Sequence, residues 1–268
     1  MRHRLLAVAA ALTFTFGLGA ATPAAAATPA SYAALGDSVA AGDGAGDYRA
    51  DGTDCHRSNR SYPALWSAAK GAGEFRLPAC SGATTQDVLD SQLAEVSPAT
   101  TAVTLTVGGN DAGFVTAVVD CLQPFTTDAK CDAALDETAR RLREDLPVRL
   151  DRTYQAVRGA APNATVAVAG YPHLLETGTP SCAVGTEPRR VRINALADQL
   201  DDLISRQADQ HGFRFADPRP AFAGHGVCAT GGHEWINRIV FLSLWESFHP
   251  TAEGYRLGYL PAVTAALG

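Results

Sequence analysis

The chain has 268 residues and a formal net charge of −6 at neutral pH. The densest basic cluster contains only Arg189, Arg190 and Arg192, which we expect on a solvated helix face, so the composition argues against a nucleic-acid partner. About 240 residues remain when the predicted N-terminal signal peptide, described next, is subtracted. This length suits one domain with a single filled core.

The first 27 residues are predicted to be a secretory signal peptide. Basic residues at positions 2–4 precede the apolar stretch from Leu5 to Leu18, and small residues surround a cleavage site near Ala26 or Ala27. A membrane anchor is the alternative, but the stretch is shorter than the roughly 20 residues that a span needs, and polar residues and glycine interrupt it. We therefore expect residues 28–268 to form a secreted, soluble domain without stable membrane anchoring.

Short apolar runs alternate with helical periodicity along this domain. The predicted strands are Tyr32–Leu35, Glu74–Pro78, Ala102–Val107, Thr165–Ala169 and Phe213–Ala216. The predicted helices are Tyr62–Lys70, Thr85–Glu95, Asp132–Arg158, Pro188–Gln210 and Thr251–Ala266. Strands separated by helices predict an α/β fold with parallel strands, right-handed crossovers and helices on both faces of the sheet.

Two segments depart from simple alternation. Pro147 lies inside the longest predicted helix and should kink it or split it in two. Residues 217–248 have several glycines and little periodicity. We expect them to form a loop region over the functional site, held in place by Cys228.

Six cysteines follow the signal peptide. An even number in an exported chain indicates disulfides, although the sequence alone leaves the pairing open. We expect the sequential pairs Cys55–Cys80, Cys121–Cys131 and Cys182–Cys228, because each bridge would then close one loop without crossing another. A zinc site is the alternative, but the chain has no CxxC pair and its histidines are scattered.

Three polar turns follow predicted strands, and ligands of such folds bind beyond the carboxyl ends of the strands. The turns contain Gly36-Asp37-Ser38, Ser81-Gly82 and Gly108-Gly109-Asn110-Asp111, and a lone His249-Pro250 lies near the end of the chain. Serine becomes a nucleophile when a base removes its proton, and histidine is the usual base. Each turn taken alone is equally compatible with ordinary turn or helix-cap chemistry.

Together these segments resemble the SGNH hydrolases, also called the GDSL family. Its four signature residues match Ser38, Gly82, Asn110 and His249 in order and spacing. The flanking segments are similar to those of secreted actinobacterial lipases and esterases. They are Cys55-His56-Arg57-Ser58, Tyr62-Pro63, Ala79 to Ala83, Gly108 to Phe114, and Trp245 to Thr251. The resemblance implies a flavodoxin-like three-layer α/β/α sandwich with a central parallel five-stranded sheet.

The resemblance also implies the roles of the signature residues. Ser38 would be the nucleophile and His249 its base. The backbone N–H groups of Ser38 and Gly82 and the side chain of Asn110 would form the oxyanion hole. The mechanism requires no metal and no cofactor.

The chain departs from the family pattern at two positions. Val39 replaces leucine at a packing position. More important, the family commonly has aspartate three residues before the histidine, where this chain has Glu246. Glu246 is therefore a possible third member of the site, and the backbone carbonyl of Glu246 or Ser247 is the alternative that we favour.

The implied activity is hydrolysis of carboxylic esters of medium- or long-chain fatty acids by a monomer. The alternatives are a phospholipase A-type activity, a polysaccharide acetylesterase and a catalytically inactive binding module. An acyl groove is predicted beside the third turn and just beyond the predicted strand Thr165–Ala169, although a core helix is the better explanation for the residues beside the third turn. Its candidate residues are Phe114, Val115, Val118, Val119, Leu122, Tyr171, Pro172 and Leu174. The regularly spaced Asp43, Asp47, Asp51 and Asp54 lack a calcium-loop pattern and are expected to lie in a solvated loop.

Overall fold

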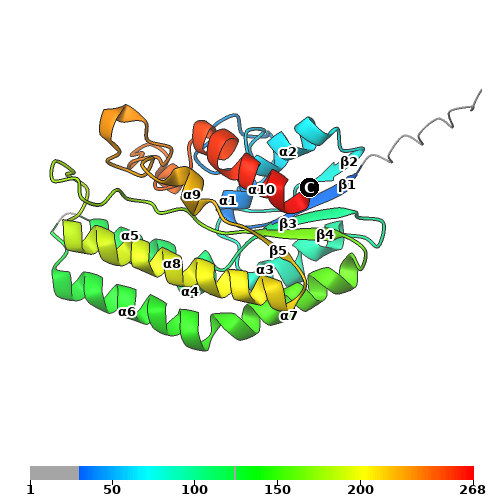
Figure 1. Ribbon diagram of the computed structural model, residues 1–268, viewed down its shortest axis with the longest axis horizontal. Coiled ribbons are helices and arrows are strands. Elements are labelled where there is room, and N and C mark those ends of the chain that lie inside the picture. The colour runs from blue at the N-terminus through cyan, green and yellow to red at the C-terminus, as the bar shows by residue number, and fades with distance from the viewer. Residues whose placement is uncertain (1–29, 124) are drawn as a thin grey trace, which may run out of the picture.

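A computed structural model describes residues 30–123 and 125–268, so the predicted signal peptide lies outside the described residues. Its core is a sheet of five parallel strands in the order β2-β1-β3-β4-β5 (Figure 1). The strands are β1 (Ser31–Gly36), β2 (Glu74–Arg76), β3 (Ala102–Thr106), β4 (Thr165–Ala169) and β5 (Arg214–Ala216). All five predicted strands are confirmed, and the two edge strands are shorter than expected.

Strands β1, β3 and β4 occupy the centre of the sheet and are almost entirely buried. Such strands lie between two helical layers, which is why they appear in the sequence as continuous apolar runs rather than as alternating patterns. The register pairs Gly36 with Thr106, so β1 and β3 end at the same edge of the sheet. This edge positions the turns that follow both strands.

Helices cover both faces of the sheet, as predicted (Figure 1). One face carries α2 (Tyr62–Lys70), α9 (Arg219–Phe222), the π-helix Gly254–Tyr259 and α10 (Leu260–Leu267). The other face carries α3 (Thr85–Asp90), α5 (Phe114–Leu122), α6 (Asp128–Glu144), α7 (Leu146–Ala160) and α8 (Glu187–Gln210). The short helices α1 (Ser38–Ala41) and α4 (Gly109–Ala112) begin directly beyond the ends of β1 and β3. The fold is therefore the predicted three-layer α/β/α sandwich.

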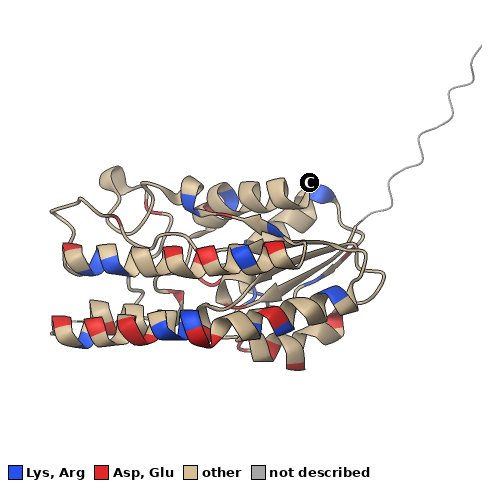
Figure 2. Ribbon diagram, turned by 60° about the horizontal axis from the view of Figure 1, so that its bottom comes forward, with Lys and Arg blue, Asp and Glu red and all other residues tan. Residues whose placement is uncertain are grey.

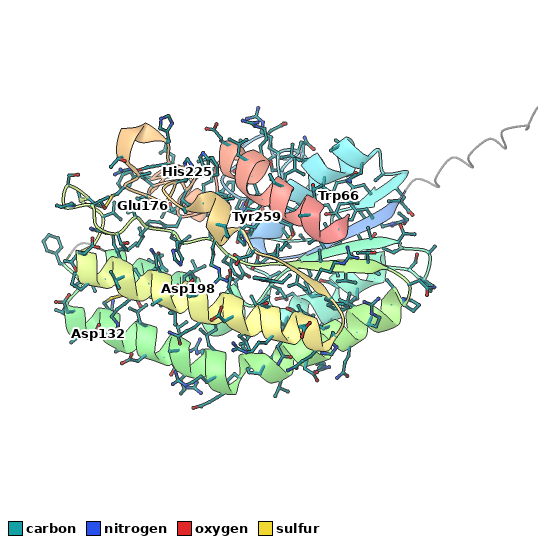
Figure 3. The ribbon with its side chains drawn as sticks, viewed as in Figure 1. Trp66, Asp132, Glu176, Asp198, His225 and Tyr259 are labelled. Carbon is teal, nitrogen blue, oxygen red and sulfur yellow. A yellow bond between two sulfur atoms is a disulfide. The ribbon has the colours of Figure 1, made fainter. Side chains whose placement is uncertain are left out.

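Aromatic side chains fill the space between the sheet and the helices of the first face. Tyr259 is fully buried, stacks on Tyr62 at a centroid distance of 5.4 Å, and donates a hydrogen bond to the carbonyl of Gly170. Trp66 packs edge-on against Tyr32 of β1. Trp66 and Tyr259 are labelled in Figure 3, on α2 and on the segment that leads into α10. These contacts fix the C-terminal segment against the sheet.

Several helix boundaries differ from the sequence expectation for local reasons. The longest predicted helix is split between α6 and α7, two residues before Pro147, because proline can occupy the first turn of a helix but not its interior. The predicted helix Thr85–Glu95 ends at Asp90 and continues as the 3-10 turn Gln92–Glu95. Residues 217–248 contain α9 and short 3-10 turns among loops, so this region is irregular as predicted.

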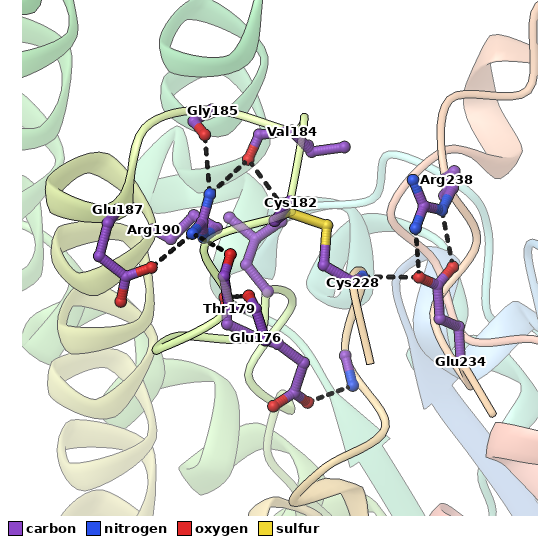
Figure 4. The surroundings of a disulfide bond; sticks show 12 residues. Glu176, Thr179, Cys182, Val184, Gly185, Glu187, Arg190, Cys228, Glu234 and Arg238 are labelled. Atoms are coloured by element: carbon purple, nitrogen blue, oxygen red, sulfur yellow. Dashed lines mark hydrogen bonds and ion pairs between the residues drawn. A yellow bond between two sulfur atoms is a disulfide. The ribbon is translucent and has the colours of Figure 1, made fainter. Parts of the chain in front are cut away.

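The structure contains the disulfides Cys55–Cys80, Cys121–Cys131 and Cys182–Cys228, the same pairs that we expected. Figure 4 shows how the third bridge joins the loop before α8 to the loop after α9. On the α9 side, the Cys228 N–H donates to Glu234, which also accepts from Arg238. The irregular region is thereby attached to the rest of the domain.

The expectation of a solvated basic face on α8 is wrong. Arg190 is buried and donates to the carbonyls of Val184, Gly185 and Thr179 beside the third disulfide (Figure 4). Arg189 donates to the carbonyls of Cys121 and Thr126, and so ties α8 to α5.

The outer helices carry both signs of charge side by side (Figure 2). Arg192 of α8 pairs with Asp132 and Asp136 of α6, and Arg140 pairs with Glu137 and Glu144 within α6. In the described part of the chain, no helix has both the length and the apolar character needed to cross a bilayer.

Candidate active site

Ser38 begins helix α1 immediately after β1, with Asp37 as its N-cap. The bend depends on Gly36, whose φ is +129° and which lies so close to β3 that a Cβ atom would sit 2.1 Å from the carbonyl oxygen of Thr106. Only glycine satisfies both requirements. The side chain of Gln92 clamps the same residue by accepting from its N–H and donating to its carbonyl, at 2.7 and 2.9 Å. The backbone that presents Ser38 is thus fixed from two sides.

His249 meets Ser38 although 211 positions separate them. The Oγ of Ser38 lies 2.7 Å from Nε2 of His249, within ordinary hydrogen-bond distance. The Nδ1 of His249 lies 3.2 Å from the carbonyl oxygen of Ser247. Because a carbonyl only accepts, this contact places the imidazole hydrogen on Nδ1 and leaves Nε2 free to accept the hydroxyl hydrogen of Ser38.

The carboxylate of Glu246 does not contact the histidine. Its Oε1 accepts a hydrogen bond of 2.6 Å from the hydroxyl of Tyr48. The Glu246 carbonyl accepts the backbone N–H of His249 at 3.2 Å, which leaves the Ser247 carbonyl as the partner of the ring. Of the options that the sequence left open, this geometry corresponds to a carbonyl-oriented histidine.

Burial lowers the pKa of His249 to about 4, and the hydrogen bond to Ser247 acts in the opposite direction. Taking an imidazolium away from water is unfavourable, so the neutral ring is the stable form near neutral pH. The neutral form is the one that can accept a proton from serine.

Two residues with backbone N–H groups that are unpaired in the described part of the chain and one asparagine line the pocket that contains the Ser38 hydroxyl. Within the described ranges, the N–H groups of Ser38 and Gly82 have no hydrogen-bond acceptor in the protein. Gly82 adopts φ +77°, a conformation that favours glycine. The Asn110 Nδ2 donates one hydrogen to the carbonyl of Ala83 at 2.9 Å, so its second hydrogen remains available. Ser38, Gly82, Asn110 and His249 all line one pocket.

The second and third turns are braced against each other. Asp111 accepts hydrogen bonds from the N–H and the hydroxyl of Thr85, at 2.9 and 2.6 Å. The hydrogen bond from Asn110 to the Ala83 carbonyl joins the same two turns. Any movement of Gly82 relative to Asn110 would have to break these bonds.

Asp43 contradicts the expectation of a solvated loop. It is fully buried, and its Oδ2 accepts a 2.6 Å hydrogen bond from the hydroxyl of Ser81, the residue before Gly82. Burial raises the pKa of this carboxyl to about 8. Asp43 therefore holds the second turn through the side chain of Ser81.

Tyr171 links the first and third turns. Its hydroxyl donates to Oδ2 of Asp37 at 2.5 Å and accepts from the N–H of Gly109 at 3.2 Å. The other carboxylate oxygen of Asp37 accepts from the Val39 N–H, and burial raises the pKa of Asp37 to about 7. A single buried hydroxyl thus spans the residues that precede Ser38 and Asn110.

The pocket has a volume of about 240 Å³ and a mainly apolar lining. Seven of the eight candidate groove residues line it: Phe114, Val115, Val118, Val119, Tyr171, Pro172 and Leu174. Leu122 is not part of the lining. Leu244, Trp245 and Phe248, which belong to the segment leading into His249, add further apolar surface to the wall.

The family model described as GDSL-like Lipase/Acylhydrolase matches residues 34–257 of the chain. The chain belongs to this family. Its relatives include Lipase 1 of Streptomyces coelicolor, which is 40% identical over 98% of this chain and 95% of that protein. The crystal structure of an extracellular lipase from Streptomyces rimosus has 41% identity and a TM-score of 0.84, covering 88% of this chain and 99% of that one.

A second solved GDSL-like relative is phospholipase A1 from Streptomyces albidoflavus NA297. It is 40% identical, has a TM-score of 0.85, and covers 89% of this chain and 100% of its own. More distant structures, such as an acetylxylan esterase from Geobacillus stearothermophilus at 14% identity and a TM-score of 0.53, share the fold alone. The GDSL-like fold expected from the sequence is confirmed.

Sequence reasoning brought together Ser38, Gly82, Asn110 and His249, and the structure places all four around the pocket. It missed the supporting contacts of Asp43, Tyr48 and the Tyr171 hydroxyl. Only Tyr171 gave a signal, because it lies two residues beyond the end of β4 and therefore at the same sheet edge as the other turns.

We predict that Tyr171→Phe lowers kcat/KM for a soluble ester by about tenfold or more, because the first and third turns lose their common hydroxyl. The free energy of unfolding should fall by about 1–3 kcal/mol, since Asp37 loses a buried donor. The matched control is Tyr154→Phe, whose equally buried hydroxyl has no partner among the described residues. If both variants behave alike in kinetics and in denaturant titration, the bridging role of Tyr171 is wrong.

Proposed function

We propose that the protein is a secreted carboxylic ester hydrolase that acts on fatty-acid esters through an acyl-enzyme intermediate on Ser38. The observation that carries this proposal is the 2.7 Å contact between the Ser38 hydroxyl and Nε2 of His249, in a pocket that Gly82 and Asn110 also line. The Streptomyces lipase relatives support the same activity.

In this proposal His249 takes the hydroxyl proton of Ser38 while Oγ attacks the ester carbonyl. The tetrahedral oxyanion accepts hydrogen bonds from the N–H groups of Ser38 and Gly82 and from Asn110. The imidazolium then gives its proton to the departing alcohol, and the acyl group stays on Oγ. A water molecule, deprotonated by the same histidine, releases the fatty acid and restores Ser38.

The apolar pocket favours a fatty acyl group over an acetyl group. Aliphatic side chains from α5 and Leu174 form much of its wall, and such a wall gains more from burying a longer hydrocarbon chain. A phospholipase A-type activity is the second candidate, because the solved phospholipase A1 is as similar to this chain as the lipases are. The acetylesterases share the fold alone and add no support for a polysaccharide substrate.

The remaining parts of the proposal concern location and assembly. Export is supported by the signal-like residues 1–27, by the three disulfides and by the extracellular Streptomyces relative. The proposed enzyme acts as a monomer, because a single chain already brings Ser38 and His249 within 2.7 Å of each other.

The primary test is hydrolysis of p-nitrophenyl esters from acetyl to stearoyl, together with labelling by a fluorophosphonate probe. We expect the rate to rise beyond acetyl, and we expect the label on Ser38, with none in Ser38→Ala of unchanged melting temperature. Release of fatty acid from phosphatidylcholine would place the enzyme with the phospholipases. An unlabelled wild-type protein that cleaves none of these esters would leave the inactive binding module as the better description.

Asn110→Ala should keep the fold and lower kcat by about 10²- to 10³-fold, because one oxyanion donor is lost. KM should change little, since the carboxamide acts on charge that develops after binding. Asn163→Ala, which alters an exposed asparagine in the turn before β4, is the matched control. Wild-type turnover in Asn110→Ala would refute its assignment to the oxyanion hole.

Glu246→Gln should lower kcat by less than about tenfold, because the carboxylate bonds to Tyr48 and a glutamine oxygen can still accept from that hydroxyl. Glu246→Ala should reduce activity only through altered packing of Tyr48. Kinetics on a soluble ester would measure both. A loss of about 10²-fold in both variants would instead assign the carboxylate to the orientation of His249.

A further inference from the structure

A run of large apolar side chains stands exposed directly beside the pocket. We call residues 239–244 the apolar loop. In this loop, Phe241, Leu242 and Leu244 are 84%, 100% and 67% exposed. Contiguous exposed apolar surface of this kind marks a contact with another apolar body, because keeping it in water is unfavourable.

The apolar loop is a structured element with a closed base. The N–H of Asn237 donates to the carbonyl of His249 at 2.9 Å, and the N–H of Phe248 returns to Asn237 at 3.0 Å. Higher in the loop, the N–H of Val240 donates to the Ser247 hydroxyl and the N–H of Ser243 donates to the Val240 carbonyl. The segment that holds His249 at its base therefore holds Phe241 and Leu242 outward at its tip.

The apolar loop is continuous with the wall of the pocket. Leu244 and Trp245 line the pocket, and Trp245 is fixed between His56, stacked at 3.7 Å, and Tyr48 at 4.8 Å. Val115 and Val119 of α5 also line the pocket and are partly exposed. Apolar surface thus extends from the interior of the pocket to the tip of the apolar loop.

The charges around the apolar loop indicate what it contacts. Positions 239–245 contain no charged residue, and Arg238, just before them, is paired with Glu234 at 2.6 Å. The chain as a whole carries a net charge of −6. A negatively charged protein with an uncharged apolar contact surface suits an electrically neutral lipid surface and gains nothing from an anionic one. A second copy of the chain seated here would cover the pocket.

We propose that Phe241 and Leu242 bind the protein reversibly to the surface of an electrically neutral lipid aggregate. This inference rests on the proposed function, and it identifies the lipid surface as the place where the enzyme takes up its ester substrate. With the tip of the apolar loop inserted, Leu244, Val115 and Val119 lie at the boundary between lipid and protein. An ester then passes from the aggregate into the pocket along apolar side chains, without crossing water.

The test compares Phe241→Ser/Leu242→Ser with the control Val148→Ser/Val191→Ser. Neither residue of the first pair lines the pocket, and the control pair is exposed on the outer helices α7 and α8. Binding to phosphatidylcholine vesicles is measured by cosedimentation, in a Ser38→Ala background that leaves the lipid intact. We expect the loop variant to bind at least about tenfold more weakly than the control, as the loss of two inserted side chains requires.

Activity measurements on the same substitutions, made with Ser38 intact, separate the lipid contact from the chemistry. Hydrolysis of soluble p-nitrophenyl butyrate should stay within about twofold of wild type, while hydrolysis of an emulsified ester falls at least about tenfold. Failure of all variants and of the wild type on the soluble ester would overturn the proposed function, whereas vesicle binding would still report on the apolar loop.

Four results would overturn the lipid contact. The loop variant could bind vesicles as tightly as the control variant does. It could also lose activity on soluble and emulsified esters equally, and Phe241 and Leu242 would then be part of the pocket. The wild-type protein could sediment as a dimer that the loop variant dissociates, which would make a second copy the occupant. Binding that requires anionic lipid would contradict the assignment to a neutral surface.

Discussion

The contact between Ser38 and His249 is the constraint on which the site depends. One partner stands on the rigid end of a central strand, and the other stands at the closed base of a loop on a different part of the chain. A displacement of either residue by about 1 Å would break this contact, because it would move the two atoms out of hydrogen-bond range. Gly36 packs tightly against Thr106, and Asn237 forms hydrogen bonds with residues 248–249. Both sets of contacts therefore help to maintain the 2.7 Å distance between Ser38 Oγ and His249 Nε2.

The rigidity of the three turns comes from buried polar groups. Asp37 and Asp43 are both removed from water, and burial raises the pKa of each, to about 7 and about 8. Burying a carboxyl is unfavourable, and hydrogen bonds from Tyr171 and Ser81 offset only part of that cost. Proteins commonly accept such a loss of stability where it holds functional groups in place. The two carboxyls stand next to the residues that they hold, since Asp37 directly precedes Ser38 and Asp43 bonds to Ser81, the residue before Gly82.

The sequence predicted the sheet and most helices from local patterns, and the four residues around the pocket from the resemblance of four short segments to the SGNH hydrolases. Apolar runs reveal buried strands, and Pro147 reveals the end of a helix. The supporting contacts could not be predicted in the same way. Asp43 lies in a glycine-rich segment that resembles any solvated loop, and its burial depends on Ser81, far along the chain. The burial of Arg190 likewise depends on three carbonyls from a loop without periodicity.

The hydrogen-bond partner of the histidine ring is a backbone carbonyl and not a carboxylate. In many hydrolases a carboxylate holds the imidazole, and its own protonation in acid removes that restraint. In this chain the partner is the peptide oxygen of Ser247, which carries no ionisable proton. The tautomer of the base is therefore maintained by a group that is indifferent to acidity, so a drop in external pH can protonate the ring without first releasing it from its orientation.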